Sequence, residues 1–91
     1  MASNFQLFYL QNADSLHLQM HGDFDGTSAY ELINTLKNQK RDYFSVFIDT
    51  SDLNIINTFG IEVFRKKLKM LVKNNRNLQF IGKHKHRFAD I

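Results

Sequence analysis

A short segment near the start of the chain alternates apolar and polar residues with the period of a β-strand. In residues 15–22 the apolar side chains Leu16, Leu18 and Met20 are separated by polar ones, which indicates one buried face and one exposed face. Residues 4–11 are predicted to form a strand before it, and the three residues between the two segments suit a tight connection. The pattern predicts a β-hairpin.

Two later segments carry apolar residues at the spacing of an amphipathic helix. The first helix is predicted to begin at Ser28, because Ser28 and Glu31 have the spacing of a capping box, and to continue to Lys40. The second helix is predicted over residues 58–74. Its core-facing stripe consists of Ile61, Phe64, Leu68, Leu71 and Val72, which fall on one side at about 100° per residue.

Two more strands are predicted between and after these helices. Residues 43–48 form an apolar run rich in β-branched and aromatic side chains, and the polar residues 49–52 are expected to stop this strand in a turn. Residues 78–82 form the last strand. The resulting order, β-β-α-β-α-β, makes each helix a crossover between parallel strands. We therefore expect a single small α/β domain over residues 1–91, with helices packed on a mixed sheet of about four strands.

The unit formed by residues 44–72 resembles the STAS domain of anti-sigma-factor antagonists and sulfate transporters. That family has a strand that reads roughly vvlDls, then a short apolar step and iDSSGl at the head of a helix. Residues 48–51 match the first part, and residues 55–61, with the sequence IINTFGI, match the second. Residues 21–29 are similar to the family's GelD..ta segment, and residues 78–82 to its next strand. The chain ends soon after that strand, so we expect a truncated version of the domain.

The resemblance implies a protein partner and no catalysis. In antagonists of this type, one hydroxyl of the DSSG tetrad is phosphorylated by the anti-sigma kinase, and the added charge releases the partner. This chain departs from the tetrad, because Asn57 replaces the acid and Phe59 the second hydroxyl, while Thr58 keeps one acceptor for a phosphate. The alternative role for Thr58 is that of a helix N-cap. We expect a regulatory module without a standard phospho-serine switch.

A second apolar strip is expected on the outer side of the helix at residues 58–74. With Ile61 at 0°, the side chains of Phe59, Val63 and Met70 cluster at about 160° to 200°, nearly opposite the core stripe. We expect this strip to be exposed and to dock a partner protein or a second copy of the chain, since aromatic anchors are common in binding hot spots. In the alternative interpretation, Phe59 folds under the preceding loop. The partner-binding residues expected from the strip and the resemblance are Asp25, Thr58, Phe59, Glu62, Val63 and Met70.

Three carboxylates suggest another kind of site. Asp23, Asp25 and Asp49 are expected near the carboxyl ends of neighbouring strands, where open α/β sheets bind ligands and carboxylates can hold Mg²⁺. In the structural alternative, Asp23 and Asp25 end one strand and Asp49 shapes the next turn. A regulatory module that binds a small ligand or nucleotide is the second functional hypothesis. A third, implied by the resemblance, is the STAS subunit of an ABC-type lipid transporter.

The other reactive side chains do not form a recognisable site. His17 and His21 lie four residues apart on one strand face without a third metal ligand nearby. No Gly-x-Ser-x-Gly elbow and no glycine-rich phosphate loop occurs in the sequence, so we expect no catalytic residue, no cofactor and no metal. The basic tail at residues 83–87 contains a His-x-His pair and is expected to be a frayed, solvated end.

Composition agrees with a small globular domain. The chain is 43% hydrophobic and 23% charged, and no apolar run approaches the roughly 20 residues of a membrane helix. There is no cysteine, and the N-terminus lacks the layout of a secretory signal, so a cytoplasmic location is expected. Residues 1–62 carry three basic and eight acidic side chains, whereas residues 63–91 carry nine basic and one acidic. We interpret the basic third as a solvated helix face and do not expect a nucleic-acid site.

Overall fold

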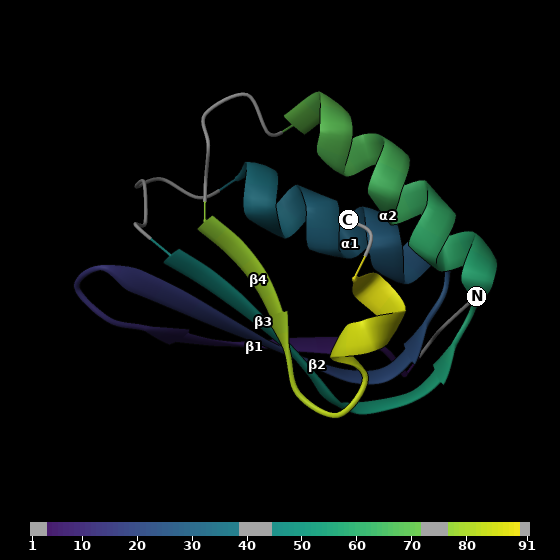
Figure 1. Ribbon diagram of the computed structural model, residues 1–91, viewed down its shortest axis with the longest axis horizontal. Helices are drawn as coiled ribbons and strands as arrows, with labels where there is room; N and C mark the ends of the chain where they lie inside the picture. Colours follow the sequence, from purple (N-terminus) through teal and green to yellow (C-terminus); the bar gives the residue numbers. More distant parts are fainter. Residues whose placement is uncertain (1–3, 39–44, 72–76, 90–91) are drawn as a thin grey trace.

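The computed structural model describes residues 4–38, 45–71 and 77–89, which form one sheet with two helices on one of its faces (Figure 1). The elements are β1 (Gln6–Gln11), β2 (Ser15–Phe24), α1 (Gly26–Lys37), β3 (Ser45–Ile56), α2 (Thr58–Leu71), β4 (Asn77–Ile81) and a short 3₁₀ helix, η1 (Lys85–Phe88). The strand order is β1-β2-β3-β4, with β1 antiparallel to β2 and the other pairs parallel. The predicted α/β class and mixed four-stranded sheet are confirmed.

The core lies between the sheet and the two helices. Leu16, Leu18 and Met20 of β2 are buried, as their alternation predicts, and so are Val46 and Ile48 opposite them on β3. From α2 the core receives Ile61, Phe64 and Leu68, whereas the side chains of the other two predicted core residues, Leu71 and Val72, lie outside the described ones. None of the helices in the described ranges is long and apolar enough to cross a membrane.

Strand β3 does not stop at the polar residues 49–52, so the predicted turn there is wrong. The strand continues to Ile56, which pairs with Phe24 at the end of β2. Its polar side chains find partners on neighbouring strands, because the hydroxyl of Thr50 donates to the carbonyl of Ile81 at 2.9 Å, and Asp52 accepts from Gln19 at 2.9 Å. A polar run can therefore extend a strand when the adjacent strands supply its hydrogen bonds.

Helix α1 begins earlier than the capping-box spacing predicts. Its N-cap is Asp25, whose carboxylate accepts a hydrogen bond from the backbone N–H of Ser28 at 3.0 Å. Ser28 is buried inside the first turn, and its hydroxyl donates to the carbonyl of Asp23 at 2.8 Å. The prediction of Ser28 as the cap is therefore wrong. Ser28 instead connects the helix to the end of β2.

The basic tail is part of the packed structure and is not a frayed end. Gly82 turns the chain at a positive φ of 97°, and the backbone N–H of His84 then donates to the hydroxyl of Thr50 at 3.0 Å. The 3₁₀ helix that follows places Phe88 in the core with 1% of its surface exposed. Its ring stacks on Phe80 of β4 with a centroid distance of 4.7 Å. The tail therefore closes the core beside β4.

Candidate functional site

The N-terminal ends of α1 and α2 lie against each other at one end of the sheet. Parallel strands β2 and β3 both end there, and the backbone N–H of Asn57 donates to the carbonyl of Phe24 at 2.8 Å. Gly60 in the first turn of α2 touches the cap of α1, because a Cβ on Gly60 would come within 2.7 Å of the Asp25 backbone. Only glycine allows this approach, so the two helix starts form one continuous surface.

Phe59 is the most prominent side chain of this surface. It is 69% exposed, and one edge of its ring rests over Gly26, where a Cβ would lie 3.3 Å from the ring. The alternative in which Phe59 folds under the preceding loop is therefore wrong. Ile55, close to the end of β3, is a second exposed apolar residue beside the helix start. We name this region the helix-start surface and define it by Asp25, Gly26, Ile55, Thr58, Phe59 and Glu62.

Of the apolar strip predicted along the outer side of α2, Phe59 is exposed as expected, and the described part of the strip does not continue at Val63. Val63 is half-buried and packs against the core, so the expectation of an exposed Val63 is wrong. Met70 belongs to α2, but its side chain lies outside the described ones. Tyr30 of α1 is 50% exposed, and the ammonium of Lys67 lies 5.3 Å from its ring centroid. Tyr30 is not among the partner-binding residues predicted from the sequence, although it follows Gly26 by about one helical turn.

The polar groups of the helix-start surface are held in fixed places by the two caps. The hydrogen bond from the Ser28 backbone lowers the pKa of the Asp25 carboxyl, against a smaller opposing effect of burial. Asn57, not Thr58, caps α2, since its side-chain oxygen accepts from the Phe59 N–H at 2.8 Å. Thr58 is an exposed residue in the first turn, and Glu62 pairs with Arg65 at 3.4 Å. The surface therefore combines an apolar centre with carboxylates nearby.

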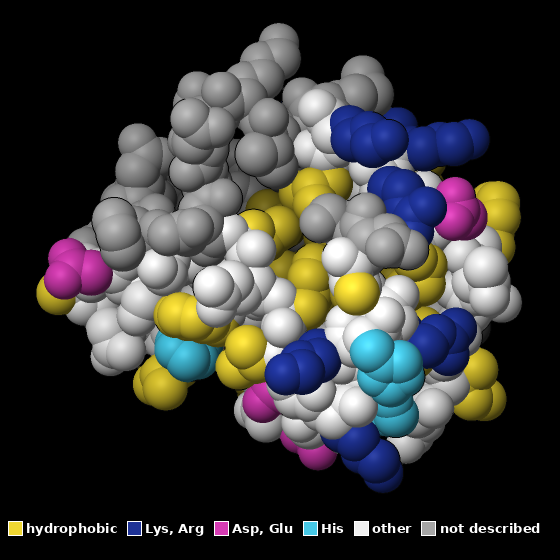
Figure 2. Space-filling view, viewed as in Figure 1, with side chains coloured by type: hydrophobic (Ala, Val, Ile, Leu, Met, Phe, Trp, Pro, Cys, Tyr) yellow, Lys and Arg dark blue, Asp and Glu magenta, His cyan; other side chains and the backbone are white. Residues whose placement is uncertain are grey.

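The described basic side chains of the C-terminal third are not among the residues that define the helix-start surface, although Arg65 pairs with Glu62 of that surface. Figure 2 shows Lys and Arg side chains over α2 and around η1. Lys66 and Lys69 of α2 are exposed, in agreement with the expected solvated helix face. Arg87 of η1 makes a structural contact, because its guanidinium donates to the carbonyl of Ile56 at 3.2 Å.

The three carboxylates expected at the strand ends do not form a common site. Asp23 accepts from the backbone N–H of Ile55 at 3.1 Å, and Asp25 is occupied as the α1 cap. Asp49 lies within β3, opposite Gln19, and accepts from the Ser51 N–H at 2.9 Å. Among the described residues, no three His, Cys, Asp or Glu side chains are grouped so that they could hold a metal ion. The contacts of Asp23 and Asp25 support the structural alternative, in which they end β2. For Asp49 that alternative is wrong, because Asp49 lies within β3 and does not shape a turn.

The two histidines of β2 face away from the helices and contact aromatic rings. The His17 ring lies 4.7 Å from that of Phe47, and the His21 ring lies 4.7 Å from that of Phe8. His21 also approaches the Asp52 carboxylate at 3.5 Å. These contacts stabilise the open face of the sheet and do not assemble a catalytic group.

Comparison with solved structures identifies the fold as STAS-like, as the sequence resemblance predicts. An anti-sigma factor antagonist from Mycobacterium paratuberculosis matches with a TM-score of 0.66 and 12% identity, over 91% of this chain and 73% of the other. The STAS domain of an antisigma-factor antagonist from Rhodobacter sphaeroides matches with a TM-score of 0.65 and 10% identity, over 87% of each chain. No family model and no curated protein matches the sequence.

Proposed function

We propose that this chain is a non-catalytic protein-interaction module of regulatory type, and that its partner protein binds the helix-start surface. The observation that carries the proposal is the exposed Phe59. A phenyl ring that remains 69% exposed gains nothing from the core, while the sheet and both helices are already packed without it. Large aromatic side chains at the centre of a surface are common anchors of protein interfaces.

The free energy that a partner can gain at this surface is estimated from the exposed ring of Phe59. Covering the free part of Phe59 removes on the order of 100 Å² of apolar surface from water, which corresponds to roughly 2.5 kcal/mol before the costs of association. Ile55 adds exposed apolar area at the same end of the sheet. Asp25 and Glu62 lie at the rim, where carboxylates favour a partner with basic side chains and increase the rate of association more than the affinity.

Thr58 is the one hydroxyl that the chain retains at the tetrad position. Its place in the first turn of α2 would allow modification, but Asn57 and Phe59 stand where the family has an acid and a second hydroxyl. We therefore propose that partner binding does not depend on a standard phosphorylation switch. Val63 contributes only the part of its side chain that remains exposed, and the role of Met70 stays a prediction.

The direct test is a capture experiment with the wild-type chain, Phe59→Ala and Phe8→Ala as parallel baits in extracts of the native host. Phe8 is a matched control, because it is also an exposed phenylalanine but points away from the helices on β1. A protein captured by wild type and Phe8→Ala should be lost with Phe59→Ala. With the purified partner, titration calorimetry should give a loss of about 1 to 3 kcal/mol for Phe59→Ala. Equal affinities of Phe59→Ala and wild type would contradict the proposal.

The two remaining functional hypotheses differ from this proposal in the molecule that binds the chain. The small-ligand hypothesis rested on a cluster of Asp23, Asp25 and Asp49, and the contacts of these residues do not support such a cluster. The transporter-subunit hypothesis requires only a different protein on the same surface. The identity of the captured protein, an anti-sigma-type kinase or an ABC transporter component, distinguishes it from the anti-sigma hypothesis.

A further inference from the structure

Strand β1 presents an unprotected edge of the sheet. In the described part of the chain it pairs with β2 alone, so the hydrogen-bonding groups on its outer side have no neighbouring strand. Its sequence, QLFYLQ, contains no charged residue and no proline, which are the features that usually protect an edge strand. Three consecutive residues of β1, Phe8, Tyr9 and Leu10, are all exposed. An uncharged, apolar edge of this kind favours pairing with another strand.

Strand β4, at the opposite edge of the sheet, has less exposed apolar surface than β1. On the helix side of β4, the ring of Phe88 in η1 stacks on Phe80 at 4.7 Å. The apolar side chains of β4, which are Leu78, Phe80 and Ile81, are all at least partly buried. The exposed apolar surface of the two edges is therefore concentrated on β1.

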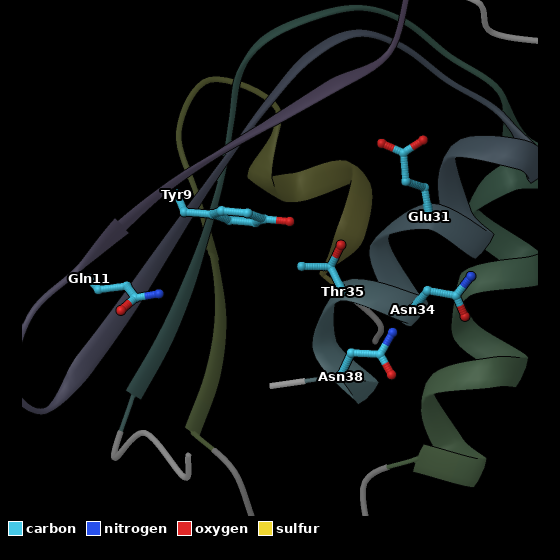
Figure 3. A pocket seen from close by; sticks show the side chains of 6 residues that line it. All are labelled: Tyr9, Gln11, Glu31, Asn34, Thr35 and Asn38. Atoms are coloured by element: carbon cyan, nitrogen blue, oxygen red, sulfur yellow. The ribbon is translucent and has the colours of Figure 1, made fainter. Parts of the chain in front are cut away.

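Hollows lie on both faces of β1 where the side chains of an added strand would project. On the helix side, a hollow of about 330 Å³ separates Tyr9 and Gln11 from α1, where it is lined by Glu31, Asn34, Thr35 and Asn38 (Figure 3). On the open side, a depression of about 210 Å³ is lined by β1, by β2 and by Asp49 of β3. Side chains of a strand alternate between faces, so one added strand would place residues on the helix side next to the hollow at Tyr9 and on the open side next to Phe8 and Leu10.

We propose that β1 pairs antiparallel with β1 of a second copy of this chain, with the Tyr9 residues of the two copies opposite each other. A two-fold axis perpendicular to the sheet then joins the two sheets into one and keeps the helices of both copies on the same side. In this register Phe8 of each copy lies opposite Leu10 of the other on the open face, and the two Tyr9 rings meet on the helix face.

The absence of charged residues in β1 favours a second copy of the chain as the strand that pairs with it. A two-fold contact brings each residue near the axis close to its own copy, so a charge near Tyr9 would lie close to a like charge. Residues 6–11 have none, and every apolar residue at the centre of the pairing meets another apolar or aromatic one. The contact does not use Phe59. The dimer therefore leaves the helix-start surface free, and the two proposals can fail independently.

The first experiment compares Tyr9→Lys with Tyr30→Lys by sedimentation equilibrium over roughly 1 μM to 1 mM protein. The two tyrosines are 57% and 50% exposed, so the substitutions are matched in type, exposure and added charge. Wild type and Tyr30→Lys should form dimers with similar dissociation constants, whereas Tyr9→Lys should dissociate at least about tenfold more readily, because two ammonium groups would face each other. A monomeric wild type, or a dimer that Tyr9→Lys leaves unchanged, would overturn the proposal.

A second variant tests the register and does not depend on the folding of Tyr9→Lys. The chain has no cysteine, so Tyr9→Cys carries a single thiol. Opposite residues of antiparallel strands have Cα atoms about 4.5 to 5.5 Å apart, which lies within the range of a disulfide. Under mild oxidation Tyr9→Cys should form covalent dimers at least about tenfold faster than Gln79→Cys on β4. Equal rates of covalent dimer formation would contradict the β1–β1 contact. Loss of the dimer in Phe59→Ala by sedimentation equilibrium would assign the dimer to the helix-start surface.

Discussion

Replacement of Phe88 by alanine should remove a large part of the stability of this domain. Phe88 is 1% exposed; its ring stacks on Phe80 at 4.7 Å and meets the Phe24 ring edge-on at 5.2 Å. Loss of a buried phenyl ring costs about 3 to 5 kcal/mol, because apolar surface returns to water and a cavity is left. A domain of 91 residues has a free energy of unfolding of about 5 to 14 kcal/mol.

Urea unfolding followed by circular dichroism measures the effect. We expect the midpoint of Phe88→Ala to fall by an amount that corresponds to about 4 kcal/mol, with an unchanged dependence on urea. His86→Ala is the control, since His86 is an exposed residue of the same 3₁₀ helix and its loss should change stability by no more than about 0.5 kcal/mol. A cost below about 1 kcal/mol for Phe88→Ala would show that η1 is not part of the cooperative fold, and would support the solvated tail that the sequence suggested.

Two further predictions concern the cap of α1 and the close contact between the starts of α1 and α2. Because the pKa of Asp25 is lowered in the folded chain, its ionised carboxylate stabilises the fold above the ordinary value of 3.8, and this stabilisation is lost as the pH falls through the lowered pKa. Asp25→Asn keeps a cap that does not titrate, so its urea midpoint should approach that of wild type between neutral pH and about pH 3; a constant difference would contradict the role of the charge. Gly60→Ala should destabilise by about 1 to 3 kcal/mol in the same assay, since its Cβ would overlap the Asp25 backbone. Gly26→Ala should cost less, because its Cβ meets only the side chain of the exposed Phe59, at 3.3 Å. Equal costs of the two glycine substitutions would mean that the helices do not approach as closely as described.

Local periodicity is sufficient to determine the element order and most of the core. The alternation of Leu16, Leu18 and Met20 and the helical spacing of Ile61, Phe64 and Leu68 each predict the face that is buried. These signals depend only on neighbours in sequence, and the crossover rule for parallel strands then limits the topology. The exposed Phe59 follows from the same helical spacing, which is why the centre of the helix-start surface could be predicted.

The tertiary structure decided the features that depend on partners distant in the sequence. Residues 49–52 look like a turn, yet Thr50 and Asp52 become strand residues because Ile81 and Gln19 supply their hydrogen bonds. Such hydrogen bonds join residues that are 31 and 33 positions apart, beyond the reach of any local pattern. The burial of Phe88 in a basic tail has the same cause, since its ring is stabilised by Phe24 and Phe80.

Packing also decided which of two candidate residues caps helix α1. Both Asp25 and Ser28 are suitable helix caps by residue type, and the sequence favours Ser28 through its spacing to Glu31. In the fold, the hydroxyl of Ser28 donates a hydrogen bond to the carbonyl of Asp23, and the carboxylate of Asp25 caps the helix. The sequence by itself determined which faces are apolar and where helices and strands occur. Only the tertiary structure decided which polar groups pair and that Val63 and Phe88 pack against the core, because both depend on which segments meet in space.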